Sequence, residues 1–131
     1  MKILNMDHFV ITVNNLDKAK DFYHRIIGLK IVNQQSNQDF VTMMCGGHSL
    51  FRLRKSTNEV NAIVAKHLST GSFDFCLESS NNVQEIIKNF ETNNIQIELG
   101  SVVKHGFKGK MMSVYVRDPD GNLVEISTYH N

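Results

Sequence analysis

The sequence lacks tryptophan and has only one proline and two cysteines among its 131 residues. It also lacks a strong charge of either sign, because 14 Lys and Arg accompany 13 Asp and Glu for a formal net charge of +1. A nearly neutral chain has no overall basic character of the kind that favours nucleic acid or an anionic membrane. No apolar run approaches the roughly 20 residues of a membrane-spanning helix. These absences predict a protein that binds neither nucleic acid nor membrane.

The two cysteines, Cys45 and Cys76, lie in apolar, strand-like runs. The first ten residues, MKILNMDHFV, carry a polar residue every few positions, unlike the apolar core of a signal peptide. We therefore expect a cytoplasmic location in which both thiols are reduced and act as small buried hydrophobes.

One order of elements, a strand, a helix and three further strands, occurs twice along the chain. In the first copy an apolar stripe at three- and four-residue spacing predicts a helix between Asn15 and Gly28. In the second copy Asn82 and Glu85 have the spacing of a capping box. The predicted strands of the first copy are residues 5–13, 29–32, 40–44 and 49–54. Those of the second copy are residues 72–78, 95–99, 110–117 and 123–128.

The two copies can be superposed on each other in sequence. A shift of 66 residues places residues 8–11 on residues 74–77, and a shift of 73 places residues 50–53 on residues 123–126. The repeat predicts an α+β fold of two tandem βαβββ modules. We expect a single domain over residues 1–131, with module one at about 1–55, a connector at 56–70 containing a helical turn near 60–66, and module two at about 71–131.

Strand alternation then places particular polar residues together. One face of each sheet must pack on a helix, which leaves His8, Asp74 and Glu125 on the opposite, concave face. Such groups cost free energy in an apolar strand unless they are paired or bind a cation, and all three can ligate a divalent metal. The fourth position that the repeat relates to them is Arg52. The alternatives are a hydrogen-bonded structural His8, an Asp74 that caps a strand end, and an ion pair between Glu125 and Arg52 that needs no metal.

Three segments resemble the vicinal oxygen chelate superfamily. They are D-H-F-V-I-T-V at residues 7–13, L-D-K-A-K-D-F-Y-H-R-I-I-G-L at residues 16–29, and V-Y-V-R-D-P-D-G-N-L-V-E-I-S at residues 114–127. That superfamily contains glyoxalase I, fosfomycin-resistance thiol transferases, extradiol dioxygenases, epimerases and bleomycin-binding proteins. The resemblance implies paired βαβββ modules that form a cupped, barrel-like mixed sheet with the helices outside, often in a homodimer.

The resemblance also implies a metal site. His8 matches the ligand of the first strand, Glu125 matches that of the last strand, and Asp74 falls where the second module commonly has His. The remaining ligand position falls on Arg52, or on Leu53 if the register differs by one residue, and neither is a usual ligand. By resemblance, His8, Asp74 and Glu125 would hold Zn, Ni, Mn or Fe, and no nucleotide cofactor is implied. A divalent ion there would act as a Lewis acid on a substrate that chelates through two oxygens, with Glu125 moving the proton.

Other residues are candidates for contacting a small-molecule substrate. Arg52 suits a carboxylate or phosphonate, because a guanidinium binds such groups bidentately. Tyr115 and Arg117 either line the same cup or lie on a solvated strand edge, and His105 lies in a glycine-flanked stretch, residues 104–109, that resembles a mobile loop over a site. The preferred hypothesis is a glyoxalase-like, metal-assisted lyase or isomerase. The alternatives are a metal-free binding or resistance protein of the bleomycin-binding type, a thiol transferase, and an extradiol-type dioxygenase.

Overall fold

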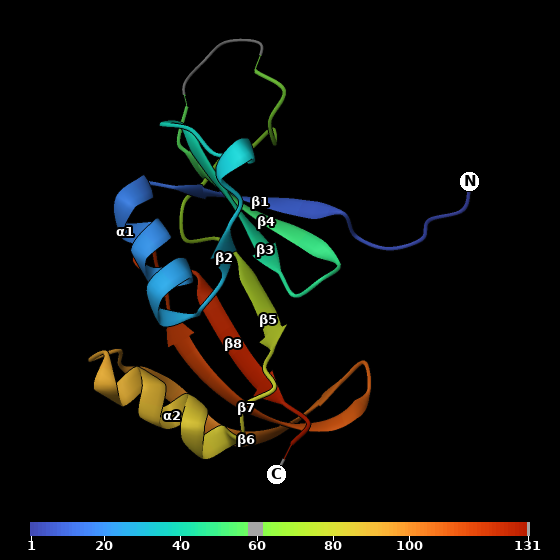
Figure 1. Cartoon of the computed structure of the whole chain (residues 1–131), viewed down its shortest axis with the longest axis vertical. Coiled ribbons are helices and arrows are strands. Elements are labelled where there is room, and N and C mark those ends of the chain that lie inside the picture. The colour runs from blue at the N-terminus through green and yellow to red at the C-terminus, as the bar shows by residue number, and fades with distance from the viewer. Residues whose placement is uncertain (58–61, 131) are drawn as a thin grey trace. The chain divides into compact units, whose positions relative to one another are not determined.

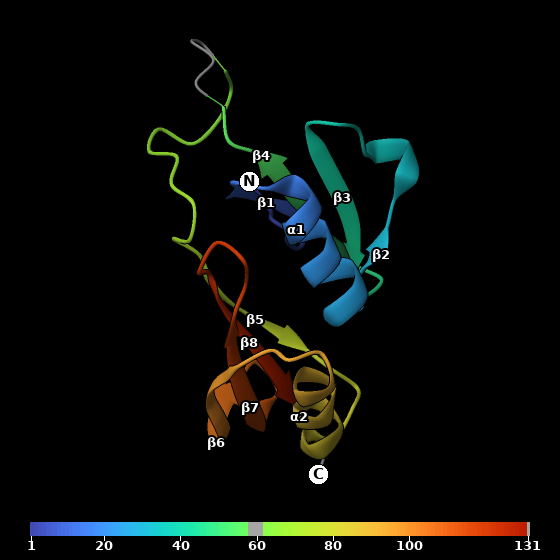
Figure 2. The same cartoon turned by 90° about the vertical axis from the view of Figure 1, so that its left-hand side faces the viewer.

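The computed structural model describes residues 1–57 and 62–130. The chain divides into two compact units, Met1–Thr70 and Gly71–Asn131, and each is a four-stranded mixed sheet with a helix on one face (Figures 1 and 2). The expected α+β class and the two βαβββ modules are therefore confirmed. Residues 58–61, in which the predicted helical turn of the connector begins, lie outside the described residues, and residues 62–66 form no helix.

The first unit has its sheet in the order β1-β4-β3-β2, with β1 parallel to β4 and the other pairs antiparallel. Its elements are β1 (His8–Val13), α1 (Leu16–Asp21), the π-helical turn η1 (Phe22–Ile26), β2 (Lys30–Ile31), the 3-10 turn η2 (Asn33–Gln35), β3 (Phe40–Cys45) and β4 (Ser49–Lys55). The first strand begins at His8 rather than at residue 5, because its ladder with β4 starts at the pair His8–Leu50.

The second unit repeats this topology with the order β5-β8-β7-β6, again with the first and last strands parallel. Its elements are β5 (Asp74–Glu78), α2 (Val83–Thr92), β6 (Ile97–Gly106), β7 (Gly109–Arg117) and β8 (Leu123–Thr128). The predicted capping box is present: the Asn82 side chain accepts from Glu85 N, and the Glu85 side chain accepts from Asn82 N.

Each unit has an apolar core between its helix and the helix-facing side of its sheet. In the first unit the Phe51 ring lies 4.6 Å from the Tyr23 ring and 4.8 Å from the Phe9 ring, centroid to centroid. Buried residues on that side include Ile11, Val13, Ala19, Phe22, Ile26, Val41, Met43 and Leu53 in the first unit, and Val83, Ile86, Phe90, Val114, Val116, Val124 and Ile126 in the second. Since alternate residues of a strand point to opposite faces, this burial commits their neighbours to the other face of each sheet.

Candidate functional site

The sheet face of the first unit that points away from α1 carries His8 and Arg52. In the parallel ladder His8 pairs with Leu50 and Val10 pairs with Arg52. Because strand side chains alternate between the two faces, His8 and Arg52 point to the same face of the sheet. Leu53, the alternative at the fourth ligand position, is fully buried on the helix-facing side. The residue that shares a face with His8 is therefore Arg52.

Both ring nitrogens of His8 have partners. Nδ1 lies 2.6 Å from Asp7 Oδ1, and a carboxylate only accepts, so Nδ1 carries the proton. Nε2 lies 3.4 Å from Arg52 Nη1, a long contact in which the guanidinium donates to the remaining lone pair. Arg52 Nη2 also donates to Gln35 Oε1 at 3.2 Å. Asp7 and Arg52 thus fix the orientation of the imidazole.

These contacts test whether the first unit suits a divalent metal. The lone pair on Nε2 is the one a metal would use, and it already accepts from a group with a full positive charge. A metal ion at Nε2 would replace that hydrogen bond and lie beside a guanidinium, and like charges at such a distance repel. The donor set of the first unit therefore does not fit a divalent ion.

The corresponding face of the second unit carries a row of polar residues across three strands. Cys76 on β5 lies opposite Glu125 on β8, and Glu125 lies opposite Tyr115 on β7. The Glu125 carboxylate interacts with the Tyr115 hydroxyl and helps to raise the pKa of that phenol. The predicted catalytic residue, Glu125, is thus flanked by a thiol and a phenol.

Two serines next to this row hold Glu125 in place. Ser127 Oγ donates to Glu125 Oε1 at 3.0 Å and lies 2.8 Å from Ser113 Oγ. The Cys76 thiol donates to Ser127 Oγ at 3.1 Å. Both serines are buried, which makes this an ordered polar network on one face of the sheet.

The network shifts two pKa values upward. Burial raises the pKa of Tyr115 to about 12, and the hydrogen bond and negative charge of Glu125 act in the same direction. Partial burial of the thiol also raises the pKa of Cys76. The hydrogen bond to Ser127 lowers this pKa, and the negative charges of Glu125 and Glu78 raise it further. Tyr115 and Cys76 are therefore protonated donors at neutral pH, and Cys76 lacks the lowered pKa of a nucleophilic thiolate.

Asp74 begins β5 and lies opposite Leu123, two residues before Cys76. It is exposed at the start of the strand. His8 belongs to the first unit, whereas Asp74 and Glu125 belong to the second, so a joint metal site of the three remains a prediction. Within the described part of either unit, no group of three or more His, Cys, Asp and Glu side chains is placed to hold a metal ion.

Arg117 and His105 are both in strands. Arg117 pairs with Glu98 through Nε and through Nη2, the latter at 2.7 Å, and Nη1 donates to Gly121 O at 3.2 Å. Its guanidinium therefore joins β7 to β6, and contact with a ligand remains a prediction. His105 pairs with Lys110 in the β6–β7 ladder, so the interpretation of residues 104–109 as a loop is wrong: Gly106 and Gly109 flank a two-residue hairpin tip.

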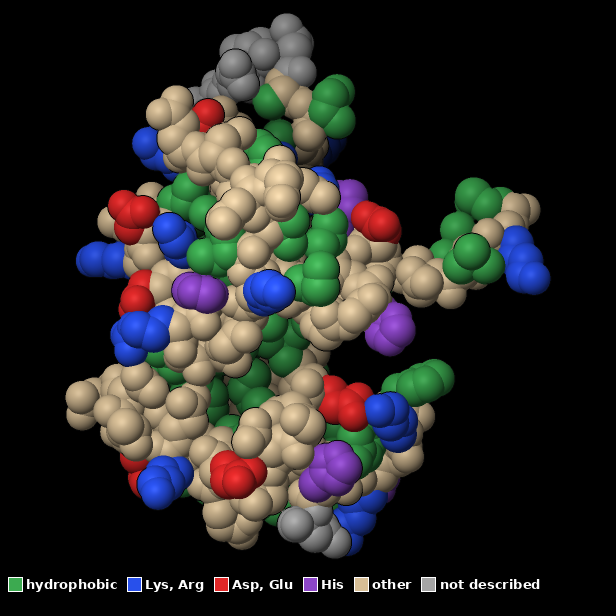
Figure 3. All heavy atoms as spheres, viewed as in Figure 1, with side chains coloured by type: hydrophobic (Ala, Val, Ile, Leu, Met, Phe, Trp, Pro, Cys, Tyr) green, Lys and Arg blue, Asp and Glu red, His purple; other side chains and the backbone are tan. Residues whose placement is uncertain are grey.

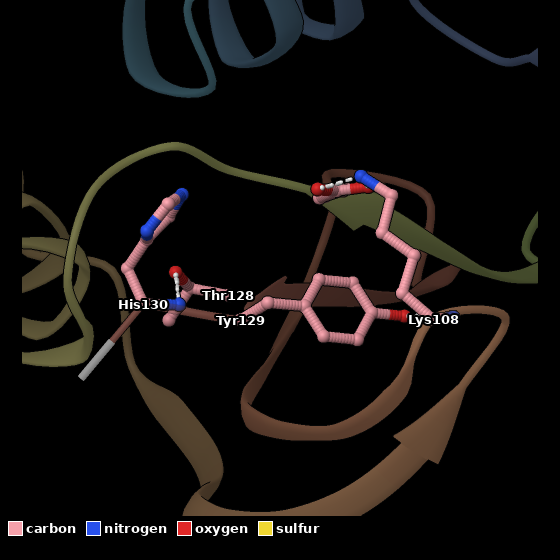
Figure 4. A network of polar contacts seen from close by, with 5 residues as sticks. Lys108, Thr128, Tyr129 and His130 are labelled. Carbon is pink, nitrogen blue, oxygen red and sulfur yellow. Dashed lines mark hydrogen bonds and ion pairs between the residues drawn. The ribbon is translucent and has the colours of Figure 1, made fainter.

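Contacts with other residues of the second unit hold the hairpin tip in place. Lys108 Nζ lies 2.6 Å from Glu78 Oε1, and the Lys108 backbone N–H donates to the Tyr129 hydroxyl at 3.2 Å (Figure 4). A Cβ added at Gly106 would clash with that hydroxyl and with the Met111 thioether, so both side chains would have to shift to accommodate another residue there.

The sequence did not identify Cys76, Ser127, Gln35 or Asp7 as neighbours of the candidate residues. Cys76 is exposed rather than buried, so its interpretation as a small core residue is wrong. The sequence did contain a signal for a shared face. Strand alternation places Cys76 on the same face as Asp74, and Ser127 on the same face as Glu125, two residues before it. Their meeting at Glu125 depends on strand register, which a single sequence does not specify.

Two further observations bear on partners. On the face shown in Figure 3, basic and acidic side chains are interspersed and do not gather into one patch of a single sign. Among the described residues, no helix has the length and apolar character needed to cross a bilayer.

With this geometry in view, comparison with known proteins identifies the family. The profile of the Glyoxalase/Bleomycin resistance protein/Dioxygenase superfamily matches residues 5–126. The chain therefore belongs to this superfamily.

Two relatives support this membership. The chain is 33% identical to the glyoxalase domain-containing protein RDO1 of Mycosarcoma maydis over 100% of the chain and 72% of RDO1. It is 32% identical to the virulence protein STM3117 of Salmonella typhimurium, over 98% of the chain and 87% of that protein. The crystal structure of STM3117 superposes with a TM-score of 0.87, covering 99% of this chain and 100% of that one.

A solved structure that is named as an enzyme is less similar to this chain than STM3117 is. The lactoylglutathione lyase of Agrobacterium tumefaciens is 26% identical and superposes with a TM-score of 0.74, over 98% of this chain and 96% of that one. The superfamily thus includes lyases of this kind, while RDO1 and STM3117 are named for a domain and for virulence.

Proposed function

We propose that this chain is a glyoxalase-like protein that binds a small, oxygen-bearing anionic molecule, and that Arg52 receives the ligand's acidic group without a metal ion at His8. The observation that carries the proposal is the contact of 3.4 Å between Arg52 Nη1 and His8 Nε2. A cation that occupies the metal-binding lone pair of His8 favours an anion on this face over a second cation.

The first unit provides a specific arrangement for such a group. Arg52 already reaches Gln35 and His8, neither of which is an acid, so its positive charge is not compensated by either. A guanidinium matches the planar geometry of a carboxylate and can bind it through two parallel hydrogen bonds. His8, fixed by Asp7, would border the bound group.

An enzyme is the second candidate, and the second unit favours it. The Glu125 carboxylate is oriented by Ser127 at 3.0 Å and interacts with the Tyr115 hydroxyl, an arrangement suited to a residue that moves a proton. A lyase or isomerase reaction would use Glu125 as the base and Tyr115 as a hydrogen-bond donor. The predicted divalent metal would require His8 to give up Arg52, so no step is derived through it.

The test is a thermal-shift screen of small carboxylic and phosphonic acids on chelator-treated protein. We expect at least one acid to raise the melting temperature of the wild type, with the shift lost in Arg52→Gln and unchanged by added EDTA. The matched control is Arg25→Gln, which removes the same type of charge from an exposed position on the helical segment, where Arg25 pairs with Asp21.

Metal titration provides the opposing outcome. In isothermal titration with Zn²⁺ and Ni²⁺, we expect no saturable binding that depends on His8. The wild type and His8→Ala should therefore give the same titration curve. Tight binding of one equivalent of metal that depends on His8 would contradict the proposal and support the metal-assisted enzyme. A homodimer and a cytoplasmic location remain predictions, and sedimentation velocity would test the former.

A further inference from the structure

Arg52 is accompanied on its face by a second arginine, Arg54. The two are separated by one residue on β4, so their side chains emerge on the same face of the sheet. Arg52 lies between Val10 and Thr42 in the ladder, and Arg54 lies between Thr12 and Phe40. None of these strand neighbours is a carboxylate.

Among the described residues, neither guanidinium has an acidic partner. The Nε atom of each is buried and has no hydrogen-bond partner. A buried charged donor without an acceptor costs free energy, and this strand carries two of them.

The other two arginines of the chain show the contrast. Arg25 binds Asp21 through two nitrogens, at 2.7 and 2.8 Å, and Arg117 binds Glu98 in the same bidentate manner. Both pairs lie at exposed positions, where an arginine needs a partner least. Within residues 1–57 and 62–130, the half-buried arginines of β4 are thus the two without a carboxylate partner.

We propose that Arg52 and Arg54 together bind a dianionic oxyanion, a phosphate or phosphonate group, of the ligand. The proposal rests on the proposed function, because it specifies the chemical class of the acidic group that Arg52 receives. Two adjacent guanidiniums match a group with close to two negative charges and three terminal oxygens, whereas a carboxylate has one charge and two oxygens.

The experiment is a titration of the full chain with inorganic phosphate and with acetate, followed by calorimetry in HEPES at about pH 8, where phosphate is mostly the dianion. Ionic strength is held constant because screening alone weakens charge–charge binding. The variants are Arg54→Gln, Arg52→Gln and the matched control Lys55→Gln. Lys55 is the next residue of β4, carries the same charge, and points to the opposite face.

We expect Arg54→Gln to weaken phosphate binding by about tenfold or more, while Lys55→Gln changes it by less than about twofold. Acetate binding should change little in Arg54→Gln, because one guanidinium suffices for one carboxylate. Circular dichroism of each variant checks the fold. Arg54→Lys, which retains the charge without the planar fork, replaces Arg54→Gln if that variant does not fold, and should also weaken binding.

The inference is overturned if phosphate binds equally well to wild type and Arg54→Gln, if Lys55→Gln has the same effect, or if phosphate shows no saturable binding. An organic acid that still stabilises the protein through Arg52 would in those cases leave the proposed function intact. Conversely, metal binding through His8 would contradict the proposed function while the phosphate titration still decided the role of Arg54.

Discussion

Tyr115 and Glu125 show how one cross-strand pair determines the chemistry of the second unit. The two residues face each other on neighbouring strands, and the negative charge of Glu125 helps to keep the Tyr115 phenol protonated. Ser127 also donates to this carboxylate, at Oε1. The result is a carboxylate of fixed orientation with a neutral hydrogen-bond donor beside it, which suits either ligand binding or proton transfer.

This pair predicts a delayed ionisation of Tyr115. Its folded pKa of about 12 lies above the ordinary value, so ionisation favours the unfolded chain. The stabilising contribution is fully present below about pH 10, and it is lost as the pH rises toward the folded pKa. Spectrophotometric titration of tyrosinate, taken as the difference between wild type and Tyr115→Phe, should place the midpoint near 12.

Replacing the carboxylate separates the contribution of Glu125 to that shift from the larger contribution of burial. Glu125→Gln should move the Tyr115 midpoint down toward its ordinary value, because the negative charge is lost. Glu91→Gln, which removes the same charge from an exposed position on α2, should leave it in place. A Tyr115 that titrates like a free tyrosine in the wild type would show that the contact does not form in solution.

At the scale of elements, the turn before β8 determines how the parallel strands of the second unit meet. Asp118 Oδ1 accepts from the backbone N–H groups of Asp120 and Asn122, and Asn122 Nδ2 donates to Asp118 Oδ2 at 2.7 Å. The Asn122 side-chain oxygen accepts from Phe73 N at 2.9 Å, just before β5 begins. One fully buried side chain thus connects the two strands that carry Cys76 and Glu125.

Asn122→Ala should therefore lower the free energy of unfolding by about 2 kcal/mol, because a buried backbone donor and a buried carboxylate oxygen lose their partner. Urea denaturation measures this loss. Asn5→Ala, in the exposed segment before β1, is the control and should stay within about 0.5 kcal/mol of wild type. Equal stability of the two variants would mean that water replaces both hydrogen bonds.

For the whole molecule, stability originates in two apolar cores. Each unit buries its own helix against its own sheet, and the buried residues of these layers are mainly aliphatic and aromatic. The site residues lie on the opposite sheet faces and contribute polar contacts such as Arg52 to His8. Folding thus relies on hydrophobic burial, and the polar residues of the candidate site lie outside these two cores.

This division predicts that the fold does not depend on a divalent metal. Treatment with EDTA should leave the melting temperature unchanged, and added Zn²⁺ or Ni²⁺ should not raise it. A metal that bound the native chain at a hundred times its Kd would add about 2.7 kcal/mol, which is several degrees for a chain of this size. Calorimetric melting with and without chelator makes the comparison, and a metal-dependent rise would argue for the metal-assisted enzyme.

Much of the fold follows from local sequence. The stripe that contains Phe22 and Tyr23 predicts the first helix, and the Asn82–Glu85 box predicts the start of the second, because both signals act within one or two turns. Residues 104–109 were less predictable. Two glycines that flank Phe107 and Lys108 are compatible with a loop as well as with a hairpin tip. The hairpin forms because β6 pairs with β7 as far as Gly106 and Gly109.

The sequence by itself determined which residues share a sheet face, since strand alternation is a local property: Arg52 and Arg54 on one strand, Glu125 and Ser127 on another. Only the tertiary structure decided which of them meet. Arg52 contacts His8, 44 residues earlier, and Cys76 reaches Ser127, 51 residues later. Such pairings depend on the register of distant strands, which the packing of each helix on its sheet selects cooperatively and no local pattern specifies.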